Sequence, residues 1–264
     1  MARILVRSTG DVGSAVAHRL FRDGHAVALV DDARPTHTRR GMAFADAVFD
    51  GKAELAGVLA KRMPDADGVE AMLACGRAIP VDVDDADRLA AAIAPDVVVD
   101  ARMRKRARAE SQRHLAPLTI GLGPGFVAGD TVDVAIETAW GDALGAVVRR
   151  GATRDLAGEP GEVGGHRRER FVYAPVAGCF RTTRAIGDHV EQGDAVARIG
   201  AVILRAPLGG RLRGLCHDGV TVAVRTKVIE VDARDDPALV RGLGARPARI
   251  AEGVCAVVAE AFPH

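Results

Sequence analysis

The chain begins with two short apolar runs separated by an amphipathic segment. Ile4–Val6 and Ala26–Val30 are continuous apolar sequence, which is typical of buried strands. Between them, after a turn of small residues, apolar side chains recur every three or four positions, at Val12, Val16, Ala17 and Leu20. This spacing indicates a helix that ends at Gly24. The pattern therefore predicts a βαβ unit of the Rossmann type, which needs roughly 30 residues.

The same alternation continues along the first part of the chain. Helical spacing follows Pro64 and stops at Gly76, and it returns over Asp84–Ala94, where Pro95 ends it. Apolar runs at Ile79–Val83 and Val97–Val99 predict further strands, and Val132–Glu137 predicts a later extended segment. Alternating strands and helices predict an α/β fold, with an open, mostly parallel sheet and helices on both faces.

The C-terminal third contains an internal repeat with an offset of 32 residues. Tyr173-Ala-Pro175, Gly178 and Gly187-Asp-His-Val190 return as Arg205-Ala-Pro207, Gly210 and Gly219-Val-Thr-Val222. Neither half could bury its apolar face alone, so the repeat predicts two halves of one small all-β barrel-sandwich hybrid domain.

These patterns predict four regions. We expect a Rossmann-like ligand-binding domain at 1–150, a Gly-rich and charged linker at 151–170, the β barrel at 171–234 and a C-terminal helical segment at 235–264. The barrel includes a returning strand at Lys227–Asp232, and a closing helix at Ile250–Phe262 is expected to pack back on the first domain.

Composition excludes several classes of function. The formal net charge of +1 and the scarcity of aromatic residues disfavour a nucleic-acid binder. No apolar run approaches the roughly 18 residues of a membrane span, and arginines interrupt the N-terminal apolar stretch, unlike a signal peptide. The four cysteines are widely spaced, which favours reduced thiols. We expect a soluble, cytoplasmic protein without membrane or nucleic-acid partners, and homo-oligomer formation is left open.

The turn after the first strand is the sharpest chemical signal. Gly10 and Gly13 occupy the second and third glycine positions of a G-x-G-x-x-G motif, and Asp11 lies between them, but Ser8 takes the first position. Either a phosphate or nucleotide binds at this helix N-terminus, or the turn is purely structural. Asp31 stands where a carboxylate receives a ribose hydroxyl in dinucleotide-binding folds, or it is a solvated strand end.

Other candidate ligand-binding residues follow predicted strands. Arg39 and Arg40 could clamp phosphate, although arginine is frequent in this chain and a surface role is the alternative. A glycine loop that contains Gly121, Gly123 and Gly125 either forms an anion-holding nest or leads the chain out of the sheet. Asp100, Arg102 and Glu137 join the candidates if they converge on the same crevice.

No residue pattern identifies a catalytic group or a metal site, so the catalytic residues are unknown and no metal ligand is assigned. His18, His189 and His217 are interpreted as structural or solvated. The repeat is similar to biotinyl and lipoyl half-barrels, but the hairpin at 198–202 has no lysine to carry a cofactor. We therefore expect no covalent biotin or lipoate, and we interpret the barrel as a docking or lid element.

Together these stretches resemble the selenium-dependent molybdenum hydroxylase system accessory family over nearly the full chain. The matching segments are Gly10–Leu20, Arg39-Arg40 with 43–48, Val99–Met103, Ile120–Phe126, Pro160–Gly165, Ala206-Pro207 and Leu212–Leu215. The resemblance implies a role in maturation of molybdenum hydroxylases such as xanthine dehydrogenases. It also implies a hydroxylase client as partner and a phosphate-bearing ligand, either a nucleotide or the molybdenum pterin cofactor.

The chain departs from this family at three places. It has Ser8-Thr9 where members look glycine-rich, it lacks an Arg and a His in 137–142, and it lacks a Lys near Ala248-Arg249. These changes are consistent with a divergent member that binds an altered ligand. They are equally consistent with one that has kept the scaffold and lost ligand binding. The alternatives to an accessory protein are an NAD(P)-dependent oxidoreductase, for which no catalytic pair is visible, and a scaffold without a small ligand.

Overall fold

The computed structural model describes residues 1–83, 85–104, 109–155 and 160–263. Its largest element is a nine-stranded sheet in the order β10-β9-β7-β6-β1-β2-β5-β4-β3. From one edge to the other, the strands are β10 (Val147–Val148), β9 (Val134–Ile136), β7 (Leu118–Leu122), β6 (Val97–Asp100), β1 (Arg3–Arg7), β2 (Ala26–Val30), β5 (Ile79–Asp82), β4 (Val58–Arg62) and β3 (Lys52–Leu55). Pairing is parallel except for β3 with β4 and β9 with β10.

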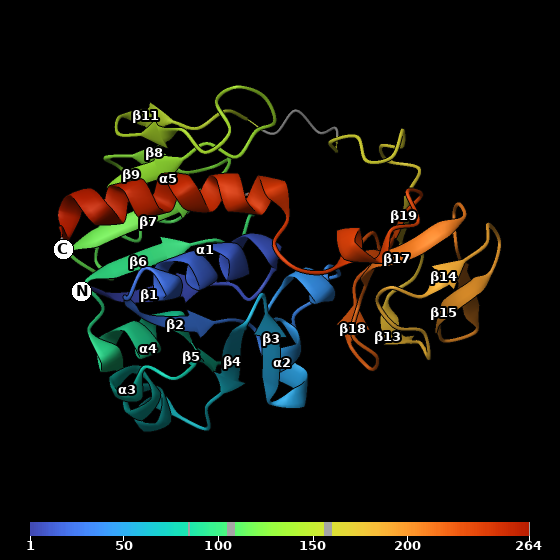
Figure 1. Cartoon of the computed structure of the whole chain (residues 1–264), viewed down its shortest axis with the longest axis horizontal. Coiled ribbons are helices and arrows are strands. Elements are labelled where there is room, and N and C mark those ends of the chain that lie inside the picture. Colours follow the sequence, from blue (N-terminus) through green and yellow to red (C-terminus); the bar gives the residue numbers. More distant parts are fainter. Residues whose placement is uncertain (84, 105–108, 156–159, 264) are drawn as a thin grey trace.

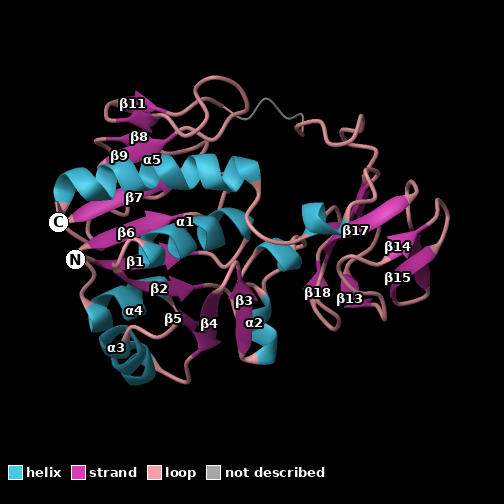
Figure 2. Ribbon diagram, in the orientation of Figure 1, coloured by secondary structure: helices cyan, strands magenta, loops and turns pink. Residues whose placement is uncertain are grey.

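Helices cover both faces of this sheet, as the alternating pattern predicts (Figures 1 and 2). They are α1 (Asp11–Arg22), the short α2 (Asp46–Asp50), α3 (Ala66–Cys75), α4 (Ala86–Ile93) and α5 (Ala245–Ala261). Side chains alternate along β1, so that Ile4 and Val6 face the core under α1 and α5 while Leu5 faces α3 and α4. The α/β class is therefore confirmed.

Local sequence explains where the helices begin. The carboxylate of Asp65 caps α3 by accepting a hydrogen bond from the Gly68 amide, and Asp85 caps α4 in the same way. The predicted start of that helix at Asp84 lies outside the described residues. The last helix starts five residues before the predicted Ile250, because Pro247 sits in its first turn, where a missing amide hydrogen costs little. It packs along α1, as expected (Figure 2).

Small antiparallel sheets follow, and we refer to 171–232 as the β-module. One sheet contains β12 (Phe171–Tyr173), β19 (Lys227–Asp232), β17 (Gly210–Leu215) and β14 (His189–Val190). The other contains β16 (Val202–Arg205), β15 (Ala195–Ile199), β13 (Gly178–Arg181) and β18 (Thr221–Val222). Both sheets contribute to one apolar core around Phe180. In Figure 1 this module lies at the far end from both marked termini.

The 32-residue repeat is visible in the strand pairing. Gly178 pairs with Val222 in one sheet, and Gly210 pairs with Val190 in the other. Each half thus supplies the glycine strand of one pair and the valine strand of the other. This reciprocal exchange explains why a single half could not form either pair.

The remaining elements were not anticipated. Edge strand β3 forms an antiparallel hairpin with its neighbour β4, and charged residues in both strands interrupt the apolar pattern. The short antiparallel pair β8 (Val127–Ala128) and β11 (Gly151–Ala152) forms a separate two-stranded sheet, which lies on the β9 side of the large sheet in Figure 1. The 3-10 turns are η1 (Arg40–Met42) and η2 (Pro237–Val240). The domain limits and the linker at 151–170, part of which lies outside the described residues, remain predictions. Among the described residues, every helix is too short or too polar to cross a membrane.

Gly13 provides a test of how tightly α1 sits on the sheet. A Cβ atom at this position would lie 2.2 Å from the Ser8 carbonyl oxygen. We expect Gly13→Ala to lower the free energy of unfolding by about 1–3 kcal/mol through overpacking. Alanine is otherwise favoured over glycine in a helix by about 1 kcal/mol, so the clash reverses the sign. Urea unfolding followed by circular dichroism measures the change.

The control is Gly209→Ala, where the nearest atom to the new Cβ is 3.4 Å away. It should stay within about 0.5 kcal/mol of the wild type. A Gly13→Ala protein as stable as this control would contradict the close approach of α1 to Ser8.

Candidate functional site

The parallel strands end together at one edge of the sheet, with the chain crossing from one side of β1 to the other. β2 lies on one side of β1 and β6 on the other, which makes the gap beyond their carboxyl ends the topological switch point. Open α/β sheets bind ligands at this place. Gly10, Asp31 and Asp100 all lie there, so the structure brings these three predicted positions to one edge.

The first turn at this edge is closed by Ser8. Its backbone has φ +127°, a value that favours glycine, and its hydroxyl oxygen accepts a hydrogen bond from the Gly10 amide. A Cβ at Gly10 would lie 3.0 Å from the ring of His37. The turn thus keeps the backbone shape of a glycine-rich loop, while the Ser8 side chain and His37 occupy the space beside it.

Asp31 is engaged by neighbouring protein groups. One carboxylate oxygen accepts hydrogen bonds from the Thr9 hydroxyl at 2.7 Å and from His37 Nε2 at 2.8 Å, besides the Thr9 amide. Burial opposes ionisation of Asp31, but the hydrogen bonds from His37 and Thr9 outweigh it and lower its pKa. Burial likewise opposes charging of His37, but Asp31 raises the pKa of the imidazole. Asp31 and His37 therefore form a charge-assisted pair beside the helix N-terminus.

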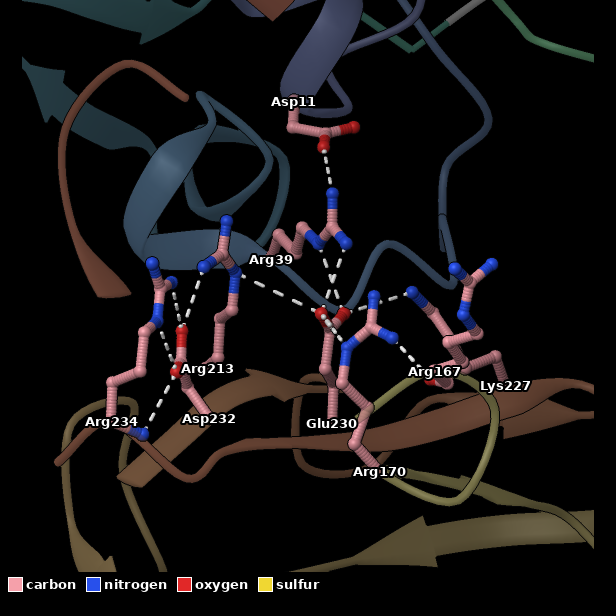
Figure 3. A network of polar contacts seen from close by, with 9 residues as sticks. All are labelled: Asp11, Arg39, Arg167, Arg170, Arg213, Lys227, Glu230, Asp232 and Arg234. Carbon is pink, nitrogen blue, oxygen red and sulfur yellow. Dashed lines mark hydrogen bonds and ion pairs between the residues drawn. The ribbon is translucent and has the colours of Figure 1, made fainter. Parts of the chain in front are cut away.

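Arg39 joins the sheet edge to the β-module (Figure 3). Its Nη1 donates to Asp11 at 3.0 Å, and its Nε and Nη2 each donate to Glu230 at 2.9 Å. Asp11 opens α1, whereas Glu230 lies in β19 and is fully buried. The forked guanidinium matches the carboxylate in two parallel hydrogen bonds, an arrangement that only arginine provides.

Further cations surround Glu230. Lys227 Nζ lies 3.1 Å from this carboxylate, and the Nε atoms of Arg170 and Arg213 lie 3.5 and 3.7 Å from it. Arg213 also reaches Asp232, which pairs with Arg234. We call this set the junction network; its members are Asp11, Arg39, Arg170, Arg213, Lys227, Glu230, Asp232 and Arg234 (Figure 3).

The junction network contains more positive than negative charge. Its five cations face three carboxylates. Burial opposes ionisation of Glu230, but Lys227 and Arg39 outweigh it and hold the pKa far below its usual range. Hydrogen bonds from Arg234 and Arg213 overcome the burial of Asp232 and lower its pKa to about 2. All three carboxylates are therefore ionised at neutral pH. Burial lowers the pKa of Lys227, although Glu230 opposes this shift. The four arginines of the network by themselves exceed the three carboxylates, so a positive excess remains.

Arg246 adds a cation on the α5 side of the same edge. Its Nη2 donates to the Thr138 carbonyl oxygen at 2.7 Å, and its guanidinium lies 5.7 Å from the ring centre of Trp140. Its Nε is buried without a hydrogen-bond acceptor among the described residues. Burial opposes ionisation of Asp11, but Arg39 outweighs it and lowers the pKa, with smaller contributions from Lys227 and Arg246. These cations therefore lie near the start of α1.

The other predicted residues form separate groups. Asp100 is buried and accepts hydrogen bonds from Arg102 and Gln112. Burial opposes its ionisation, but the hydrogen bonds from Arg102 outweigh this and lower its pKa. Arg40 donates to Asp46 and to the Leu215 carbonyl oxygen, which fastens η1 to the β-module. Glu137 is buried and accepts hydrogen bonds from the amides of 138, 139 and 154.

The glycine loop has a packing explanation at two of its positions. A Cβ at Gly121 would lie 2.3 Å from the Phe126 ring, and Gly123 has φ +91°. A Cβ at Gly123 would also meet Met103, whose own φ is +54°, so the loop lies beside the end of β6. Gly125 has φ +92° and accepts a hydrogen bond from the Ala109 amide through its carbonyl oxygen. Ligand binding by this loop remains a prediction.

Comparison with known proteins gives one close match in sequence. No protein-family model matches the chain. The chain is a homologue of "Uncharacterized protein YqeB" of Escherichia coli K12, with 39% identity over 236 residues that cover 89% of this chain. Those residues are 43% of the relative, so the chain spans less than half of its length.

Similarity to solved structures is weak. An aspartoacylase family protein from Mesorhizobium loti has 16% identity and a TM-score of 0.26, with 88% of this chain and 85% of that chain covered. The product-bound ectoine utilization protein EutE (DoeB) from Ruegeria pomeroyi has 13% identity and a TM-score of 0.26, with 87% and 85% covered.

Sequence reasoning missed His37 and most of the junction network. Glu230 carried a signal, since it is the single charged residue within the apolar run Val228–Val231. A charged residue in such a run needs a buried partner. Its partner Arg39 is 191 positions away, and the spacing of residues cannot show that contact.

Arg39 tests the strength of the junction network. Arg39→Met removes both hydrogen bonds to Glu230 and leaves that carboxylate fully buried. Removing one partner of a buried ion pair costs about 3–5 kcal/mol, because the other charge stays buried without its partner. In Arg39→Met, Lys227 still compensates part of the charge of Glu230. We therefore expect a loss of about 3 kcal/mol in unfolding free energy, measured by urea denaturation.

The matched control is Arg249→Met, which removes an exposed ion pair with Glu252 in α5. Exposed pairs contribute about 0–1 kcal/mol. An Arg39→Met protein that loses no more stability than this control would show that the junction network does not hold the β-module in place.

Proposed function

We propose that this chain binds a phosphate-bearing ligand where the carboxyl edge of the sheet meets the β-module. The observation that carries this proposal is the excess of cations in the junction network beside the start of α1. A helix N-terminus and clustered arginine and lysine both favour anions. The ligand we expect is a nucleotide or the molybdenum pterin cofactor.

The geometry favours the cations over the glycine turn as the anion contact. Asp11 and Asp31 bring two carboxylates to the first turn of α1, where a phosphate would otherwise bind. The positive charges of Lys227 and Arg246 both act on Asp11 and lower its pKa. The ligand's phosphate is therefore expected to contact these two side chains, with Gly10 and Gly13 shaping the turn behind them.

The biological role we propose is that of an accessory protein in maturation of molybdenum hydroxylases of the xanthine dehydrogenase type. This role rests on the sequence motifs, which extend over nearly the whole chain. The β-module would dock the hydroxylase client. An NAD(P)-dependent oxidoreductase is less favoured, because His37 and Thr9 already use the Asp31 oxygen that would receive a ribose hydroxyl.

The binding proposal is tested by calorimetric titration with CTP, GTP and NAD. We expect a nucleoside triphosphate to bind, and Lys227→Gln and Arg246→Gln each to weaken binding about tenfold. A hydrogen bond to a charged group contributes about 1.5–3 kcal/mol, which corresponds to that factor or more. Lys61→Gln, at an exposed lysine on β4, is the matched control and should bind like the wild type.

Other results would overturn the binding proposal. If none of these ligands binds and molybdopterin species also fail, the junction network acts as a scaffold that joins two parts of the chain. If NAD alone binds and Asp31→Asn abolishes its binding, the oxidoreductase alternative is correct.

The maturation role is tested by deleting the gene in the source organism. We expect the molybdenum content and activity of a xanthine dehydrogenase-type hydroxylase to fall while its polypeptide level stays constant. Wild-type and Lys61→Gln chains should restore both properties, and Lys227→Gln should not. Unchanged molybdenum content in the deletion strain would contradict the role, independently of ligand binding.

A further inference from the structure

We propose that Asp46, Asp50 and His217 form a binding site for a divalent transition-metal ion at the contact between α2 and the β-module. The two aspartates are the first and last residues of α2, and His217 lies in the loop between β17 and β18. One carboxylate oxygen from each aspartate and one imidazole nitrogen lie within 4.8 Å of one another. This site is separate from the junction network and does not depend on the proposed function.

The two aspartates are placed by helical geometry. Residues at positions i and i+4 project from one face of a helix, so Asp46 and Asp50 present their carboxylates on the same side of α2. His217 Nε2 lies 3.4 Å from Asp50 Oδ1. Ions bound at about 2.0–2.2 Å hold pairs of ligand atoms up to roughly 4.4 Å apart. Asp50 is exposed, so a small rotation of its side chain brings all three ligand atoms within this range.

The His217 ring is held in an orientation suited to a metal ligand. Its Nδ1 lies 2.8 Å from the backbone carbonyl oxygen of Asp218, so Nδ1 carries the proton and donates it. In the neutral ring, Nε2 then has its lone pair available on the side of Asp50. Phe49 stacks on the ring, with 4.1 Å between the ring centres and planes 10° apart. A hydrogen bond at the second ring nitrogen is the usual support of a metal-binding histidine.

Asp46 has comparable support. Arg40 Nη1 donates to Asp46 Oδ1, and Arg40 Nε donates to the Leu215 carbonyl oxygen, so this guanidinium is fixed from both ends. In the proposed site the second oxygen of Asp46 binds the ion, and the two carboxylates outweigh the single positive charge of Arg40. Metal-binding carboxylates are commonly hydrogen-bonded in this way.

The donor set indicates the class of ion. Two carboxylate oxygens and one imidazole nitrogen suit Zn²⁺, Mn²⁺, Co²⁺ or Fe²⁺, because imidazole is a poor ligand for Ca²⁺ and Mg²⁺. Three protein ligands leave further coordination positions to water. An ion bound here would also link α2 to the β-module, so binding should raise the unfolding temperature in proportion to ion concentration.

The test uses the full chain stripped of metal with a chelator. Mn²⁺ is titrated and its free form quantified by electron paramagnetic resonance, because the exposed thiols of Cys75 and Cys179 compete for Zn²⁺. We expect one Mn²⁺ per chain, and at least tenfold weaker binding in Asp50→Asn and in His217→Gln. Circular dichroism without metal should be the same in all three proteins.

The matched control is His189→Gln. His189 is an exposed histidine of the same β-module, and its ring nitrogens lie 3.9 and 3.7 Å from carboxylates of Glu191 and Asp235. It should bind Mn²⁺ like the wild type. Equal binding by the wild type and His217→Gln would overturn the proposal, and so would no binding of Mn²⁺ or Zn²⁺ by the wild type at millimolar concentrations.

Discussion

The buried pair of Arg39 and Glu230 is the contact on which the arrangement of this molecule depends. The apolar cores of the sheet and of the β-module form separate clusters, and the partly buried Phe49 packs against both. Polar contacts therefore act together with Phe49 to set how the two parts meet. Removing Glu230 from water is costly, and a single ion pair does not always compensate for that cost. The two parallel hydrogen bonds from Arg39 and the nearby charges of Lys227 and Arg170 supply the compensation.

One short segment, residues 36–42, contributes several polar contacts between the sheet and the β-module. The segment contains Arg39 and Arg40, whose side chains reach β19 and β17. In addition, the Thr38 carbonyl oxygen accepts a hydrogen bond from the Leu215 amide. The Gly41 carbonyl oxygen accepts one from the Gly242 amide. The segment follows β2 and leads into α2, so it connects the carboxyl edge to both candidate sites. The pairing of β1 with β2, the start of α1 and the position of the β-module are thereby coupled through a few residues.

Local sequence patterns predicted the helices and strands better than the contacts between distant segments. Continuous apolar runs identified β1, β2, β5 and β6 because strands buried on both faces need no polar alternation. The 32-residue offset predicted the paired halves of the β-module because each half lacks a partner by itself. In contrast, residues 36–42 have no periodicity, and their partners lie in β17 and β19. Contacts between such distant segments depend on tertiary packing, which spacing along the chain does not record.

The turn at the start of α1 directs two of its backbone amides to side chains of the protein. In a glycine-rich turn the backbone amides face a phosphate. Here the Gly10 amide donates a hydrogen bond to the Ser8 hydroxyl, and the Thr9 amide donates one to the Asp31 carboxylate. The positive end of the helix is thus partly neutralised by Asp31 and Asp11. Positive charge near Asp11 comes from Arg39, and also from Lys227 of β19 and Arg246 of α5. An anion bound as we propose would therefore contact side chains from α5 and from the β-module beside the sheet edge, so that its affinity would depend on how these elements are arranged.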